Sequence, residues 1–130
     1  MALVGDSFNI FYALKNVLIK RSINLACASM TVTEKQTGQV FVGVVDAVFQ
    51  LPAVTSQNKG IWYTFVCGVA SAGTGLSVSP AAADKILQLA KADNVDYVNS
   101  GATDVVGDSV TVASDGADGW VLLSRVGTWL

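Results

Sequence analysis

Apolar and polar residues alternate along much of the chain, and a period of two predicts β-strands. The clearest strand is 61–70, whose aromatic and β-branched residues indicate burial on both faces, or burial on one face with a partner on the other. A short strand is expected at 76–80, and the strands 104–114 and 119–127 close the chain. The pattern predicts a mainly β fold, either an antiparallel sandwich or a barrel-like module.

A hairpin is expected earlier in the chain. Residues 28–35 alternate, residues 36–39 form turns readily, and 40–52 continue as one long strand or as two strands with a kink near Gly43. Pro52 ends this run, because proline cannot donate a hydrogen bond to a neighbouring strand.

Helical spacing occurs in two places. Within 7–21, Phe11, Leu14 and Leu18 recur at intervals of three and four, so the segment predicts a short N-terminal helix or an extended arm. Within 81–94 the spacing predicts a short helix or an irregular loop.

The chain is expected to form one compact domain. Its 130 residues suffice to bury a core without disulfides or metals, and no repeat or linker divides them. We expect 1–45 to hold the arm or helix and the first hairpin, and 46–130 to form a β module.

Aspartates cluster toward the C-terminal end, at Asp104, Asp108, Asp115 and Asp118. A calcium loop needs about six oxygen ligands at a regular spacing, which these positions do not provide. The stretch 114–119, SDGADG, contains two Asp-Gly pairs, a strong signal for a hairpin turn. We therefore predict a turn between the last two strands and no metal site.

The residue types that carry most enzyme chemistry are scarce. The chain has no histidine, which removes the commonest general base, the usual catalytic triads and most zinc sites. Its single glutamate, Glu34, is expected in a solvated turn. Cys27 and Cys67 lie in apolar segments and are expected to be buried free thiols. We predict no catalytic, cofactor-binding or metal-ligating residue, and hence a protein that is not an enzyme.

Composition indicates protein partners. Hydrophobic residues make up 52% of the chain and charged residues 14%, against an average of about 25% charged. A domain of this size cannot enclose that much apolar surface, so part of it must face lipid or other protein chains. The longest apolar run is interrupted by Asp46, Gln50 and Pro52 and is too short for a spanning helix. With a net charge of −2 and no basic groove, we expect other subunits as partners, and neither membrane nor nucleic acid.

Residues 46–130 also carry an ordered set of motifs: a strand ending in Leu-Pro, an aromatic strand, a short strand ending in proline, and a final Asp-Gly hairpin with tryptophan. The positions are Leu51–Pro52, Gly60, Tyr63, Phe65, Val78, Pro80, Asp84–Ile86, Gly107–Val110, Ser114–Gly116 and Trp120. In this order they resemble a trimer-forming β module of tailed-bacteriophage virion proteins. Because no shaft sequence accompanies the module, the chain is most similar to the capsid decoration (cement) protein family.

The resemblance implies a structural virion protein, made in the host cytoplasm and placed on the outer surface of the capsid. It implies a homotrimer that binds the major capsid protein and stabilises the icosahedral shell. The alternative is a head-fibre or tail-fibre module that binds a host surface receptor through the turns 54–59 and 92–104.

Six apolar or aromatic residues are candidate contacts in such an assembly. The N-terminal group is expected to reach a neighbouring subunit or the capsid protein, and the last tryptophan is expected to be an exposed second contact. Ordinary packing within one subunit is the alternative at both ends. The candidates are Phe8, Ile10, Phe11, Tyr12, Trp62 and Trp129.

Overall fold

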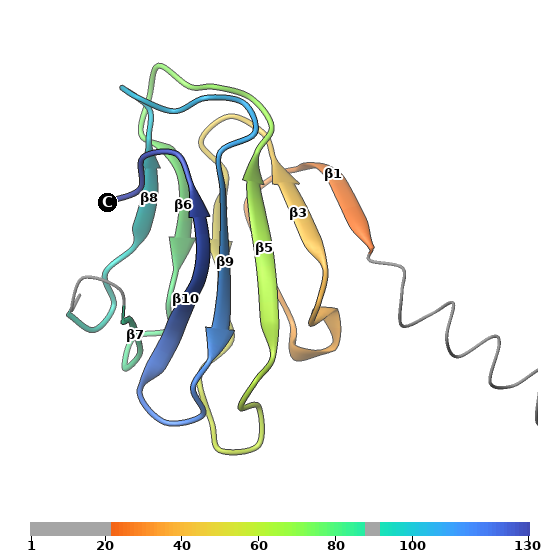
Figure 1. The fold of residues 1–130 in the computed structure, drawn as a ribbon, viewed down its shortest axis with the longest axis vertical. Coiled ribbons are helices and arrows are strands. Elements are labelled where there is room, and N and C mark those ends of the chain that lie inside the picture. Colours follow the sequence, from red (N-terminus) through yellow and green to blue (C-terminus); the bar gives the residue numbers. More distant parts are fainter. Residues whose placement is uncertain (1–21, 88–91) are drawn as a thin grey trace, which may run out of the picture.

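The computed structural model describes residues 22–87 and 92–130, which fold into two packed β-sheets (Figure 1). The large sheet has the strand order β1 (Ile23–Cys27), β3 (Val40–Gly43), β5 (Trp62–Cys67), β9 (Ser109–Ser114), β10 (Gly119–Val126) and β7 (Lys85–Ile86). The small sheet has the order β2 (Met30–Thr31), β4 (Val48–Gln50), β6 (Gly75–Ser79) and β8 (Tyr97–Ser100), and a 3-10 turn, Glu34–Gln36, follows β2. The mainly β class is confirmed, and the helix or arm predicted at 7–21 lies outside the described residues.

The chain crosses between the sheets after almost every strand. Strands β1 to β9 alternate between the large and the small sheet, and only β9 and β10 are consecutive in one sheet. The crossovers that join the first six strands leave β1–β3–β5 and β2–β4–β6 parallel. Antiparallel pairing joins β5 to β9, β9 to β10 and β6 to β8. The sheets are therefore mixed, where an antiparallel arrangement was expected.

The hairpin predicted from 28–35 and 40–52 is wrong. Strands β2 and β3 belong to different sheets, because the chain crosses over between them. Residues 40–52 divide after Gly43 into β3 and β4, which confirms the two-strand alternative. Glycine allows close packing here, because a Cβ at this position would come within 2.4 Å of the buried Leu76 side chain and would force it to move. A period of two identifies a strand but does not identify its partner.

The region after β6 also differs from expectation. The described residues of 81–94 follow the loop alternative and not the helix, except that Lys85–Ile86 forms the short strand β7, in which Ile86 pairs with Trp120. The segment 92–104, expected to be a turn, contains β8, in which Tyr97 and Asn99 are buried. Strands this short contain too few alternations for a periodic pattern to reveal them.

Aromatic side chains fill the space between the sheets. Every second side chain of β5 is buried there. The Phe65 ring lies 5.6 Å from that of Phe41 in the neighbouring strand and 5.0 Å from that of Phe49 in the small sheet, between ring centroids. Tyr63 packs on Trp120 at 5.7 Å. Burying each of these side chains stabilises the fold by about 1.5–3 kcal/mol. The aromatic side chains therefore determine which face of the large sheet packs inward, and the alternate residues face outward.

Candidate interaction surface

Five strands of the large sheet present no charged side chain on the outward face. Side chains in β3, β5 and β9 alternate between this face and the core, and the strand register places the outward positions in common rows. We call this surface the uncharged face. It consists of Ile23, Val40, Val42, Trp62, Thr64, Val66, Ser109, Thr111, Ala113, Val121, Leu123, Ser124 and Val126.

One row of this face runs across all five strands. Ile23 pairs with Val40, and Val40 pairs with Thr64. Thr64 then pairs with Thr111, and Thr111 pairs with Ser124. The hydroxyl oxygens of the two threonines are 2.9 Å apart and form a hydrogen bond. One hydroxyl therefore donates to the other within the sheet, and covering this pair leaves only one of its two O–H donors in need of a new acceptor.

A hollow of about 430 Å³ lies on the uncharged face near the start of β5. Strand β10 bulges at this point, because its register with β9 shifts between Leu122 and Ser124 and leaves Leu123 as an extra residue. The lining residues are Gly60, Trp62, Thr111, Ala113, Leu123 and Ser124. The walls combine a half-buried indole and a leucine with the hydroxyl groups of Thr111 and Ser124. The hollow therefore suits an uncharged side chain that offers an aromatic or apolar surface together with a hydrogen-bonding group, or one that leaves the hydroxyls in contact with water.

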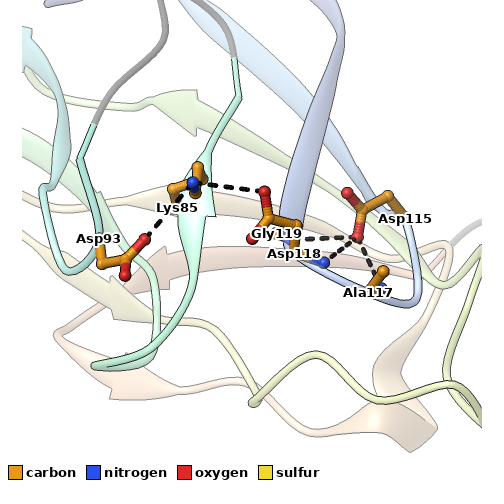
Figure 2. Close-up of polar contacts among 6 residues, drawn as sticks. All are labelled: Lys85, Asp93, Asp115, Ala117, Asp118 and Gly119. Carbon is orange, nitrogen blue, oxygen red and sulfur yellow. Dashed lines mark hydrogen bonds and ion pairs between the residues drawn. The ribbon is translucent and has the colours of Figure 1, made fainter.

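Two cations of the same sheet are engaged elsewhere. Lys85 of β7 lies 3.7 Å from a carboxylate oxygen of Asp93 and 3.3 Å from one of Asp118 (Figure 2). Arg125 of β10 donates a hydrogen bond of 3.0 Å to the Tyr97 hydroxyl. The uncharged face can therefore meet an apolar protein surface without removing a charge from water.

The turn between β9 and β10 is organised by Asp115. Its Oδ1 atom accepts hydrogen bonds from the backbone N–H groups of Ala117, Asp118 and Gly119 at 2.8, 2.8 and 3.0 Å (Figure 2). Burial acts to raise the pKa of the Asp115 carboxyl, but these hydrogen bonds, with the charge of Lys59, lower it overall. The predicted hairpin turn is confirmed, and this carboxylate is used to hold the backbone.

Aspartates elsewhere also hold loops. Asp46, at φ +54, accepts hydrogen bonds from the Ser71 hydroxyl and, at 2.8 Å, from the Gly75 amide, and these two bonds lower its pKa. Asp104 accepts a hydrogen bond of 2.8 Å from the Ser71 amide. Within the part of the chain that the structure describes, no three side chains of metal-ligating type are placed to hold an ion.

The two cysteines are free, as predicted. Cys27 and Cys67 pair with Gly43 from opposite sides, so two strand spacings separate them. That is about 9–10 Å between Cα atoms, beyond the roughly 7 Å that a disulfide allows. Burial raises the pKa of both thiols, although Cys27 is only half-buried. Both thiols therefore act as packing groups of low reactivity.

Trp129 is not the exposed contact that its place near the chain end suggested. It is 2% exposed, and its ring stacks on Tyr97 with centroids 5.7 Å apart. Its Nε1 atom donates a hydrogen bond of 3.0 Å to the carbonyl of Val126. This tryptophan cannot reach a partner without leaving the core, so packing within the subunit accounts for it.

Of the remaining candidates, Trp62 lies on the uncharged face and lines its hollow. The N-terminal candidates Phe8, Ile10, Phe11 and Tyr12 lie outside the described residues. Sequence reasoning missed the neighbours of Trp62, such as Thr111, Ala113 and Leu123. Part of their signal was available: the outward positions of 61–70 and 104–114 carry no charge, although a solvated face of an antiparallel sheet is normally polar. In 119–127, strict alternation places Arg125 beside Val121, and only the bulge at Leu123 turns it to the other face.

In comparisons with known proteins, no family model matches this chain, and no curated protein matches it. Among residues 22–87 and 92–130, no helix has the length and apolar character needed to cross a bilayer. The chemistry of the uncharged face is therefore the main structural clue to function.

Proposed function

We propose that this chain is a structural virion protein that decorates and stabilises the icosahedral capsid of a tailed phage, as a homotrimer bound to the major capsid protein. The observation that supports this best is the uncharged face. Five strands expose side chains that are apolar or bear only hydroxyl groups, around a hollow beside Trp62. Such a face is suited to protein contact, and the motifs of residues 46–130 point to the capsid as its setting.

The stabilisation would be thermodynamic. A protein that binds only the assembled shell shifts the equilibrium toward that shell by mass action. Three linked subunits would give three contacts at high effective concentration, so the total affinity is large even where each contact is weak. This role needs no catalytic group, and the carboxylates of the described residues that we traced bind loop backbones or Lys85.

The alternative function, receptor binding as a fibre module, places the contact in the turns. The turn 54–59 is closely tied to the fold: Asn58 is 2% exposed and accepts hydrogen bonds from the Thr55 amide and the Ser114 hydroxyl. The segment 92–104 contains the paired strand β8. Neither feature favours a recognition loop.

The test uses DNA-filled heads of the encoding phage, prepared without this protein. Heads are heated with and without the purified chain, and DNA release is followed with a fluorescent dye. We expect the chain to raise the release temperature. Thr111→Asp, which places a charge on the uncharged face, should abolish that shift. Thr103→Asp, the same substitution at an exposed turn position, is the matched control and should preserve it.

Two results would contradict the proposal. One is an unchanged release temperature at saturating concentration. The other is binding of the chain to host cells that Thr103→Asp abolishes and Thr111→Asp does not, which would support the receptor-binding alternative.

A further inference from the structure

The chain contains a second stretch without charge, outside the described residues. Residues 7–14, SFNIFYAL, lie between Asp6 and Lys15 and include three aromatic side chains. Burying an isolated charge is expensive, so an uncharged stretch and an uncharged face can associate where charged ones cannot. The two surfaces match in chemistry.

Symmetry indicates that the uncharged face meets a different part of its neighbour. This step rests on the homotrimer of the proposed function. In a cyclic trimer each contact is heterologous, so one surface of a subunit meets another surface of the next. Two copies of the uncharged face packed on each other would give a two-fold dimer instead. The trimer therefore needs a second apolar surface, which residues 7–14 supply.

The N-terminal residues join the fold at the level of the hollow. The Ser22 carbonyl accepts a hydrogen bond of 2.9 Å from the Val40 amide, and the next residue, Ile23, begins the row that ends at Thr111 and Ser124 in the hollow wall. Four strand spacings cover about 19 Å. Residues 14 and 7 precede Ser22 by eight and fifteen positions, which allows a reach of at most about 26 and 50 Å. The longer reach exceeds the distance of about 19 Å across one copy's own sheet, so the stretch is long enough to extend past the sheet edge toward a neighbour that packs against it.

We propose that residues 7–14 of one copy bind the uncharged face of the neighbouring copy, with Phe11 or an adjacent aromatic residue in the hollow beside Trp62. Each copy then gives its N-terminal stretch to one neighbour and receives that of the other. The contact closes a ring of three and covers the apolar face that the sandwich itself leaves open.

Cross-linking between two different chains tests this directly. Both chains carry Cys27→Ser and Cys67→Ala, one adds Phe11→Cys and the other, with a tag that changes its mass, adds Ala113→Cys. After mixing and mild oxidation, we expect a disulfide-linked pair of the two chains on a non-reducing gel. Thr103→Cys in place of Ala113→Cys is the matched control and should give none.

A chain carrying both Phe11→Cys and Ala113→Cys completes the test. Bridges formed only within that chain would overturn the exchange between copies, because they would mean that the stretch folds back on its own sheet. An absence of any bridge in both arrangements would overturn the contact itself.

A second readout keeps both native cysteines, in case the cysteine-free background folds poorly. Trp120 and Trp129 are buried, whereas Trp62 is half-buried, so acrylamide quenching of tryptophan fluorescence reports chiefly on Trp62. Phe11→Asp should increase quenching and weaken self-association by about a hundredfold or more, since a carboxylate would enter an apolar contact. Phe11→Leu should retain both properties. Unchanged quenching and self-association in Phe11→Asp would overturn the proposal.

These measurements use no phage heads, so the two proposals can fail separately. Cross-linking without any rise in DNA-release temperature would keep the exchange and reject the capsid role. A rise in release temperature without cross-linking would do the reverse.

Discussion

The two faces of strand β5 have similar composition and different surroundings. On the inner face, Tyr63 and Phe65 are 0% exposed and contact rings from both sheets. On the outer face, Trp62, Thr64 and Val66 are only half-buried. Neither face carries a charge. The strand sequence is therefore that of a strand covered on both sides, and the described chain covers one side.

This difference indicates which surface of the fold contacts another protein chain. A soluble sheet normally separates apolar inward residues from polar outward ones, and here the outward residues of five strands are apolar or bear hydroxyls. Charged residues are placed in turns and at the sheet margin, as at Asp115 and Lys85. The aspartates, which could be mistaken for a functional site, thus hold turns in place. The uncharged face is the surface available to a partner.

The largest expected effect is a difference in unfolding free energy between substitutions on the inner and the outer face of β5. Phe65→Ala removes a fully buried ring and should lower the free energy of unfolding by about 3–5 kcal/mol, from lost burial and the cavity left behind. Val66→Thr, one residue along and nearly the same shape, should change it by less than about 0.5 kcal/mol. Urea unfolding of dilute, unassembled chain measures both. Equal losses for the two variants would mean that the outer face is also closed within one chain.

Much of the fold was predictable from local pattern, and the strand pairing was not. Strand β5 and the β9–β10 hairpin follow from alternation and from the Asp-Gly pairs at 114–119. The parallel partners of β3 and β4 depend on crossovers between sheets, which no local pattern specifies. Trp129 shows the same limit, because its burial depends on Tyr97, which lies in β8, far earlier in the chain. The face around Trp62 was only partly predicted, because its width appears only when five strands are aligned.

A smaller loss of stability is expected when the turn between β9 and β10 loses its organising carboxylate. Asp115→Ala removes the acceptor of three backbone hydrogen bonds and should cost about 1–2 kcal/mol of stability. Asp115→Asn retains an acceptor oxygen and should cost less. Asp118→Ala removes only an ion pair with Lys85 at the protein surface, which water screens, and should cost less than Asp115→Ala. A larger loss for Asp118→Ala than for Asp115→Ala in urea unfolding would contradict this account of the turn.

The smallest expected effect is a dependence of stability on acid. The pKa values of Asp46 and Asp115 are lowered in the folded state from 3.8. The folded chain therefore favours the charged forms, and their contribution is present above the unfolded pKa and is lost as pH falls through the folded values. The urea midpoint should decline below about pH 4, and Asp115→Asn should make that decline shallower. An equally steep decline in the variant would show that Asp115 takes no part in it.

The central claim is that the uncharged face is covered by another copy of this chain. Sedimentation equilibrium at micromolar concentration tests it most directly, with Thr111→Asp beside the unaltered chain. The account predicts a trimer for the unaltered chain and a folded monomer for Thr111→Asp. A monomeric unaltered chain, or a trimer that Thr111→Asp leaves intact, would contradict it.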